Sequence, residues 1–434
     1  MNLRLFLFIP HPSSLIPQKT MTVKLSDISE ARTNLDGIII PTPILPDANL
    51  TKEIGAEAFL KAECLQRGGS FKIRGAYNKI HRLDEAEKKR GVIAASAGNH
   101  AQGVALAAKL HNIKATIVLP EFAPLTKITA TKNLGAKVIL FGKSFDEAVA
   151  HSKKLCEERE LTYVHAFEDD HIIAGQGTIG WEIVEDLSNA TLVVVPIGGG
   201  GIISGIALAV KNLLPKVRVI GVQAANCAAV KKSLEAGKPV EVESQATIAD
   251  GIAVKRPGEK TLPIIRELVD EIVEVSEEEI ARGIFHCIQN NRLVVEGAGA
   301  AGVAALLAKK IKVKPDDIVC TVLCGGNIDA NLLSRVLEQV LVRQGRYIML
   351  KLLVVDRPGN LARLLERTAE AGANVIEVYH RRAMWLAPLG YVGIEMLLEV
   401  RDQTHGREVL KHLQDSGYQA EHEGVGDWEL KSKK

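Results

Sequence analysis

The sequence has few aromatic residues, little net charge and no long apolar run. Aromatic residues make up 4% of the 434 residues, which argues against a surface that stacks nucleic-acid bases. The formal net charge is +2, so the composition does not favour nucleic-acid binding either. No apolar stretch reaches the roughly 20 residues that span a bilayer, so we expect no membrane partner. The remaining composition, 47% hydrophobic and 24% charged, is typical of a globular protein.

The six cysteines form no pattern of a metal site or a disulfide framework. No CxxC spacing occurs, and Cys320 and Cys324 have no histidine or cysteine partners at the spacing of zinc ligands. We therefore expect reduced thiols, a cytoplasmic location and no bound metal.

A chain of this length predicts two to four domains. We expect residues 1–21 to be a disordered extension, or to precede the true start of the protein, because the apolar run at 3–9 is short and prolines follow it. Residues 22–330 alternate short apolar, β-branched runs with helical patterns, which is typical of buried parallel strands and an α/β class with wound sheets. The expected strands are at 91–95, 115–119, 137–141, 192–197, 217–222 and 318–323.

A second pattern begins after a helical connector at 331–345. The order strand, helix, strand, strand, helix, strand over residues 346–422 predicts a ferredoxin-like βαββαβ unit. The polar tail at 423–434 is expected to be frayed.

The first chemical motif is Ser-Phe-Lys-Ile-Arg-Gly-Ala at 70–76, after the turn Arg-Gly-Gly. A helix start near Lys72 would disfavour its ammonium, so the pKa of Lys72 should fall, and a neutral lysine can form an imine. Taken alone, such a lysine is more often a solvated surface residue. The neighbouring motifs reverse that judgement.

Three further motifs follow expected strands. Ser-Ala-Gly-Asn-His at 96–100 predicts an anion site at a helix start, with the Asn99 amide as an additional donor. Four glycines at 198–201 let successive amides converge on one phosphate, and they lack the lysine and the acidic partner of nucleotide-binding loops. Cys-Gly-Gly-Asn at 324–327 also ends a strand. Ligands of such sheets bind beyond the carboxyl ends of the strands, so we expect all four motifs to form one cleft.

Taken together and in this order, these motifs resemble the threonine dehydratases (threonine ammonia-lyases) of pyridoxal-phosphate (PLP) fold type II. Gly-Gln-Gly-Thr-Ile-Gly at 175–180 and Thr-Ile-Ala-Asp-Gly at 247–251 are similar as well. The resemblance covers about 25–330 and implies a two-lobed catalytic domain, with a small lobe at roughly 70–170. Residues 346–422 resemble an ACT domain, an amino-acid-sensing module, with Arg-Pro-Gly at 357–359 in its first turn.

The resemblance implies a role for each residue. Lys72 would carry PLP as a Schiff base and act as the catalytic base, with Phe71 beside it. Asn99 would bond the phenolate oxygen of PLP, and Cys324 would face its pyridine nitrogen. The phosphate would bind Gly198, Gly199, Gly200, Gly201 and the amide of Ile202. The substrate would contact Ser96, Ala97, Gly98, Asn99, His100 and Glu296.

These roles imply the dehydration and deamination of L-threonine to 2-oxobutanoate and ammonia, a step toward isoleucine, in a homo-oligomer regulated by an amino acid. Two alternatives remain: a serine- or hydroxyaspartate-preferring dehydratase of the same fold, and a non-catalytic amino-acid sensor. Two positions depart from relatives. Ala97 stands where serine racemases carry a proton-donating serine, and the stretch 223–229 lacks the acidic residues with which some relatives bind a divalent cation.

Overall fold

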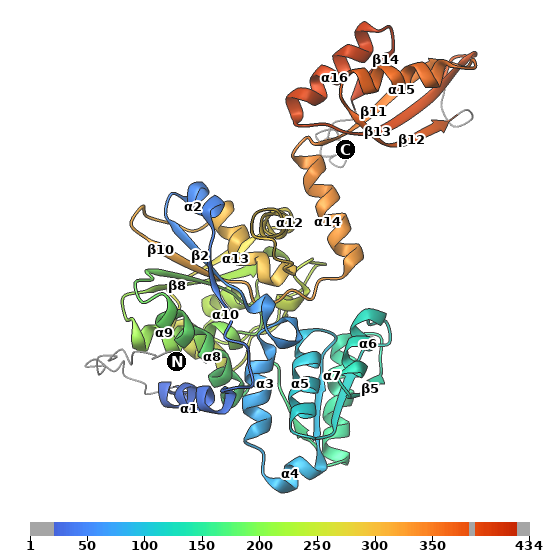
Figure 1. Ribbon diagram of the computed structural model, residues 1–434. Coiled ribbons are helices and arrows are strands. Elements are labelled where there is room, and N and C mark those ends of the chain that lie inside the picture. The colour runs from blue at the N-terminus through green and yellow to red at the C-terminus, as the bar shows by residue number, and fades with distance from the viewer. Residues whose placement is uncertain (1–20, 382–386, 423–434) are drawn as a thin grey trace, which may run out of the picture. The chain divides into compact units, whose positions relative to one another are not determined.

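The structure is a computed structural model that describes residues 21–381 and 387–422 (Figure 1). Of the expected extension at 1–21, only Met21 is among the described residues, and it is buried. Residue 422 is the last one described, so the expected tail lies outside them. Backbone contacts divide the chain into two units, Met1–Asp329 and Ala330–Lys434.

The first unit contains two sheets, and its larger lobe is built on six strands. All neighbours in this sheet are parallel except β1 and β2, which are antiparallel. Every residue of the central strand β7 is buried, because a parallel sheet in this class is covered on both faces. The strand order is β1 (Ile44–Pro46), β2 (Glu57–Lys61), β10 (Ile318–Val322), β7 (Leu192–Pro196), β8 (Arg218–Ala224) and β9 (Glu271–Val275).

The small lobe has a four-stranded, wholly parallel sheet. Its order is β5 (Lys137–Leu140), β4 (Ala115–Leu119), β3 (Val92–Ala95) and β6 (Thr162–Tyr163). The expected strands at 91–95, 115–119, 137–141, 192–197, 217–222 and 318–323 are therefore confirmed as β3, β4, β5, β7, β8 and β10. The small-lobe helices are α3 (Lys72–His81), α4 (Glu85–Arg90), α5 (Asn99–Leu110), α6 (Leu125–Asn133) and α7 (Phe145–Glu158).

Helices also pack on the larger lobe and connect it to the small one. Helix α8 packs against α9, α1 and α3, and α13 packs against α12 and the strands β7, β8 and β9. These helices are α1 (Leu25–Leu35), α2 (Ala48–Ile54), α8 (Asp170–Asp186), α9 (Gly201–Leu213), α10 (Ala229–Ala236), α11 (Thr261–Leu268), α12 (Glu277–His286) and α13 (Gly297–Leu307). Short helical turns are η1 (Glu63–Leu65), η2 (Arg67–Gly69), η3 (Ala225–Cys227), η4 (Asp250–Ile252) and the π-helical η5 (Cys287–Asn291).

The motif at 175–180 is explained by close packing of α8. A Cβ on Gly175 would lie 2.6 Å from the Cα of Gly75 in α3. A Cβ on Gly205 of α9 would lie 2.5 Å from the amide nitrogen of Gly177. Helix α3, which begins at Lys72, and helix α9, which begins in the glycine loop, therefore both pack closely on α8 because these positions lack side chains.

The second unit begins with α14 (Ala330–Arg343), so the expected connector is largely one helix with Val336 and Val340 buried. Its sheet is antiparallel throughout, and its core includes Leu350, Leu364 and Met396. The expected βαββαβ order is confirmed, and the strand order β12-β13-β11-β14 is that of a ferredoxin-like unit. The elements are β11 (Tyr347–Val355), α15 (Asn360–Glu370), β12 (Asn374–Arg381), β13 (Tyr391–Glu399), α16 (Gln403–Asp415) and β14 (Gln419–His422).

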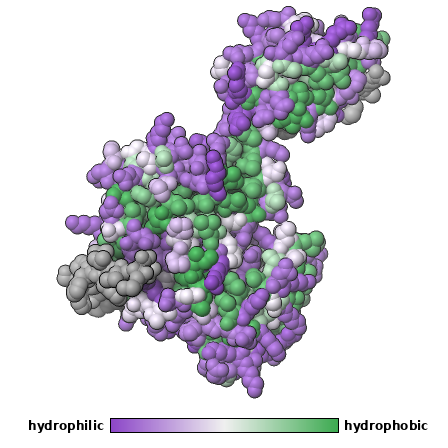
Figure 2. All heavy atoms as spheres, viewed as in Figure 1, coloured by the Kyte–Doolittle hydropathy of each residue, from purple (hydrophilic) through white to green (hydrophobic). Residues whose placement is uncertain are grey.

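Figure 2 shows polar residues over most of the visible face, with smaller hydrophobic areas between them. Among the described residues, no helix is both long enough and apolar enough to cross a bilayer.

Candidate active site

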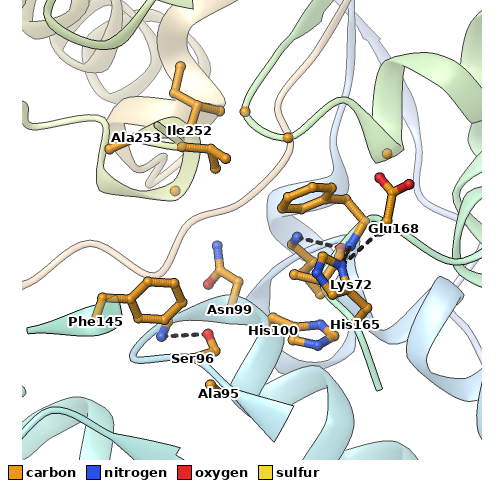
Figure 3. A pocket seen from close by; sticks show the side chains of 18 of the residues that line it. Lys72, Ala95, Ser96, Asn99, His100, Phe145, His165, Glu168, Ile252 and Ala253 are labelled. Atoms are coloured by element: carbon orange, nitrogen blue, oxygen red, sulfur yellow. Dashed lines mark hydrogen bonds between the residues drawn. The ribbon is translucent and has the colours of Figure 1, made fainter. Parts of the chain in front are cut away.

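All the cofactor and substrate residues expected from the sequence line one cavity of about 760 Å³ in the first unit. The small lobe contributes the start of α3 and the turn between β3 and α5. The larger lobe contributes the turn between β7 and α9, the end of β10 and the residue before α13. Figure 3 shows Lys72 on one side of this cavity and Phe145 and Ile252 on the other. The expectation that the four motifs form one cleft is therefore confirmed.

Lys72 is the first residue of α3, directly after the N-cap Phe71. Its Nζ donates a hydrogen bond of 3.3 Å to the Ala166 carbonyl and lies 5.0 Å from the centre of the Phe71 ring. Desolvation lowers the pKa of Lys72 to about 8, while Cys324 and Glu296 act in the opposite direction. Burial is thus the leading cause of the expected decrease, and a substantial fraction of the lysine is a neutral amine near pH 8.

The glycine loop presents backbone amides to the cavity. Gly200 has a φ of +97° and caps α9, and a Cβ there would lie 2.7 Å from the Thr261 hydroxyl. A Cβ on Gly199 would lie 2.3 Å from the Phe167 ring. In the described part of the chain, the amides of 198–202 donate no hydrogen bond to a protein acceptor. Free amides at a helix N-terminus form an anion site, which suits a phosphate.

Asn99, the first residue of α5, is held by two side chains from the larger lobe. Its Nδ2 donates to Glu296 at 2.6 Å, and its Oδ1 accepts from Asn327 at 2.7 Å. Glu296 is buried, and desolvation together with Asp250 raises its pKa to about 7. The sequence indicated Asn99 and Glu296 as separate contacts, and the structure brings them into direct contact.

Cys324 lies two residues beyond the end of β10, and only 3% of it is exposed. Burial raises the pKa of its thiol well above the ordinary value, so the thiol is neutral at physiological pH. Its carbonyl accepts a 3.1 Å hydrogen bond from the Phe71 amide, which ties this strand end to the residue before Lys72.

The turn between β3 and α5 is organised by local hydrogen bonds. The Ser96 hydroxyl accepts from the Gly98 amide at 3.1 Å. The His100 ring donates to the Val164 carbonyl at 2.8 Å, and burial lowers the pKa of His100 to about 3. His100 is therefore neutral and anchors α5. The substrate contacts of Ser96, Ala97, Gly98 and His100 stay a prediction.

Sequence reasoning missed a buried ion-pair network behind Lys72. The Arg74 guanidinium pairs with Glu63 at 2.7 Å and with Glu182 at 2.5 Å, and Lys61 pairs with Glu182 at 2.6 Å. Arg74 stands in the quoted lysine motif, but its partners come from η1 and α8, at positions that no local spacing indicates. The network fixes the first turn of α3 to the larger lobe.

Sequence reasoning also missed the cavity residues Lys127 and Asp250, although Asp250 belongs to a quoted motif. Within 21–381 and 387–422, no group of three or more His, Cys, Asp or Glu side chains is arranged to hold a metal ion.

Comparisons with known proteins agree with this geometry. Residues 35–325 match the model of a family described as pyridoxal-phosphate dependent enzyme, and the chain belongs to that family. It is 50% identical over 397 residues to an L-threonine ammonia-lyase of Thermotoga maritima, covering 92% of this chain and 98% of the relative. It is 46% identical over 324 residues to the L-threonine dehydratase catabolic TdcB of Staphylococcus aureus, covering 74% of this chain and 94% of that protein.

A solved structure is similar as well. The processed form of threonine deaminase isoform 2 from Solanum lycopersicum matches with a TM-score of 0.69 and 36% identity, over 76% of this chain and 99% of that one. The cofactor of the family is PLP, and the cavity fits it. A partly neutral Lys72 can react with the aldehyde of PLP, and the amides of the glycine loop can bind its phosphate. The neutral thiol of Cys324 suits an unprotonated pyridine nitrogen.

Proposed function

We propose that this protein is an L-threonine ammonia-lyase, which converts L-threonine into 2-oxobutanoate and ammonia. The carrying observation is the convergence of Lys72, the glycine loop and the neutral Cys324 on one cavity, in a chain 50% identical to a protein of that name. Bound PLP withdraws electrons from the bonds at the substrate Cα.

The chain's own residues divide the remaining tasks. The Lys72 amine would hold the cofactor and would take the Cα proton of the substrate as general base, for which a pKa of about 8 is suitable. The amides of 198–202 would hold the phosphate, and Asn99 would donate a hydrogen bond to the phenolate oxygen. The Cys324 thiol carries no charge that would keep the pyridine nitrogen protonated. A weaker electron sink favours prompt loss of the β-hydroxyl over transamination.

The experiment is to measure 2-oxo acid and ammonia release from L-threonine, L-serine and hydroxyaspartate by the PLP-loaded protein. We expect L-threonine to have the highest kcat/KM. A higher kcat/KM for serine or hydroxyaspartate overturns the substrate assignment. Release from none of the three, with PLP bound, favours the non-catalytic sensor.

We propose that the C-terminal unit is an ACT-like regulatory domain, which binds an amino acid and supports a homo-oligomer. A second cavity of about 320 Å³ supports this proposal. It lies at the turn between β11 and α15, where Gly359 has a φ of +87° and caps α15. Its lining includes Arg357, whose guanidinium group suits the carboxylate of an amino acid. Isoleucine or valine is the expected effector, because 2-oxobutanoate is a precursor of isoleucine.

We also propose a cytoplasmic location, which all six cysteines as free thiols support.

A further inference from the structure

Asn327 connects the turn before Lys72 to the centre of the cavity. Its Nδ2 donates to the Gly68 carbonyl at 2.8 Å and to Asn99 Oδ1 at 2.7 Å. A carbonyl oxygen can only accept, so the Gly68 contact fixes which end of the Asn327 amide faces Gly68 and Asn99. Both hydrogens of that NH₂ group are then used.

The orientation of Asn327 determines that of Asn99. Because Asn327 presents a donor, Asn99 must face it with Oδ1 and present Nδ2 on its other side. That Nδ2 donates to Glu296 Oε1 at 2.6 Å. An amide nitrogen carries two hydrogens, so one stays available in a residue that lines the cavity.

Two glycines make room for this chain of amides. A Cβ on Gly69, whose φ is +72°, would lie 2.4 Å from Asn327 Oδ1. A Cβ on Gly325 would lie 2.5 Å from Glu296 Oε1 and 3.1 Å from Asn99 Nδ2. The side chains of Asn327, Asn99 and Glu296 are therefore confined, and rotation of one requires rotation of the next.

We propose that Asn327 is a positioning residue that fixes the orientation of the Asn99 amide. The Gly68 carbonyl orients Asn327, Asn327 orients Asn99, and Asn99 therefore directs its NH₂ group toward Glu296 and the cofactor. This inference rests on the proposed function for the role of Asn99. Glu296 is the far end of the relay, and its carboxyl group changes charge near neutral pH because burial raises its pKa to about 7. A reversed Asn99 would place a carbonyl oxygen against both Glu296 and a phenolate.

The experiment uses Asn327→Asp, which keeps the shape of the side chain and removes both donors. The introduced carboxylate makes Asn99 rotate, so that the Asn99 NH₂ group faces this carboxylate and its Oδ1 faces Glu296. The probe is pyridoxine 5′-phosphate, which has the ring, phenol and phosphate of PLP but no aldehyde to react with Lys72. Its affinity for the cofactor-free, full-length protein is measured by calorimetry between pH 5.5 and 9.

We expect Asn327→Asp to weaken binding of the probe about 10- to 100-fold, the effect of losing a hydrogen bond to a charged group. The pH step that belongs to Glu296 should move upward, because a facing carbonyl disfavours its anion. Glu296→Gln, and the double variant with Asn327→Asp, should lack that step.

Asn212→Asp is the matched control. Asn212 is a buried amide that, like Asn327, donates to a backbone carbonyl, that of Leu208, at 2.8 Å, and it does not line the cavity. We expect its probe affinity within twofold of wild type. An Asn327→Asp protein with unchanged affinity and pH step, or an equal loss in Asn212→Asp, overturns the proposal. If Asn327→Asp does not fold, Asn327→Ala is measured in its place, and an unchanged affinity for the probe in that variant overturns the proposal. Because the probe does not react, an inactive wild type overturns the proposed function and leaves this test intact.

Discussion

Lys127 and Asp250 form an ion pair of 2.5 Å between α6 of the small lobe and η4 of the larger lobe, and both line the cavity. A second pair, Lys255 with Asp146 at 3.2 Å, also joins the larger lobe to the small one among the lining residues. Two ion pairs thus join the lobes across the cavity that Lys72 lines. The pairs are partly exposed, so each contributes up to about 1 kcal/mol.

Reversing the charge of Lys127 should impair turnover, because it replaces the attraction between the two lobes with repulsion. We expect Lys127→Asp to lower kcat/KM for L-threonine about 3- to 10-fold at low salt, with a smaller loss at high salt because mobile ions screen the repulsion. The exchange variant Lys127→Asp with Asp250→Lys should recover most of the loss. The measurement is steady-state kinetics at two ionic strengths. An exchange variant whose kcat/KM is no higher than that of Lys127→Asp contradicts the pairing.

The proposed role of Lys72 predicts that a variant without its amine is inactive. Lys72→Ala should lose activity and the visible absorbance of covalently attached PLP, because the amine beside Ala166 is removed. Absorption spectra after dialysis and an assay of 2-oxobutanoate are the measurements. The exposed Lys89→Ala in α4 is the control and should behave as wild type. A Lys72→Ala protein that keeps the absorbance shows that another lysine carries the cofactor.

The pKa of Lys72 predicts how reconstitution depends on pH. Desolvation lowers this pKa to about 8, so the neutral amine becomes the main form as the pH rises above that value. The rate at which the cofactor-free protein attaches PLP should rise from pH 6.5 to 8 and level off near pH 9. Stopped-flow absorbance gives this rate. A rate that still rises tenfold per pH unit above pH 9 would indicate an unperturbed lysine.

The phosphate assignment is tested by Gly200→Asp. We expect PLP affinity to fall at least about tenfold, because a carboxylate and a Cβ would enter an anion site. Gly237→Asp is the matched control: Gly237 also has a positive φ, +72°, but nothing lies within 4 Å of an added Cβ. It should share the cost of backbone strain and keep wild-type affinity. Equal PLP affinity in the two variants, measured by equilibrium dialysis, would falsify the phosphate site.

The sequence predicted the central strands and the four motifs because both are local. A buried parallel strand is a continuous apolar run, as in β7, and a glycine loop is a run of one residue type. The strands β1 (Ile44–Pro46), β2 (Glu57–Lys61), β6 (Thr162–Tyr163) and β9 (Glu271–Val275) are short or mixed in composition and are not predicted. Contacts such as Arg74 with Glu182, or Asn99 with Asn327, join positions over a hundred residues apart. They depend on how α3, α5 and α8 pack, which residue spacing does not determine.

The regulatory proposal predicts that removal of the C-terminal unit abolishes a response to amino acids. We expect isoleucine or valine to change the KM or kcat of the full-length protein, with a coupling of about 1–3 kcal/mol, or roughly 5- to 150-fold in affinity.

The cut is best made after Asp329, because α14 begins at Ala330 and belongs to the C-terminal unit, with Val336 and Val340 buried. The shortened protein should keep PLP binding, since every predicted cofactor residue precedes the cut. Arg357→Glu in the second cavity is the companion variant and should weaken the effector response without altering PLP content. Both forms are titrated with candidate amino acids while 2-oxobutanoate is followed. A full-length protein that responds to none of them, with kinetics equal to those of the shortened form, makes this unit a structural or oligomerisation module instead.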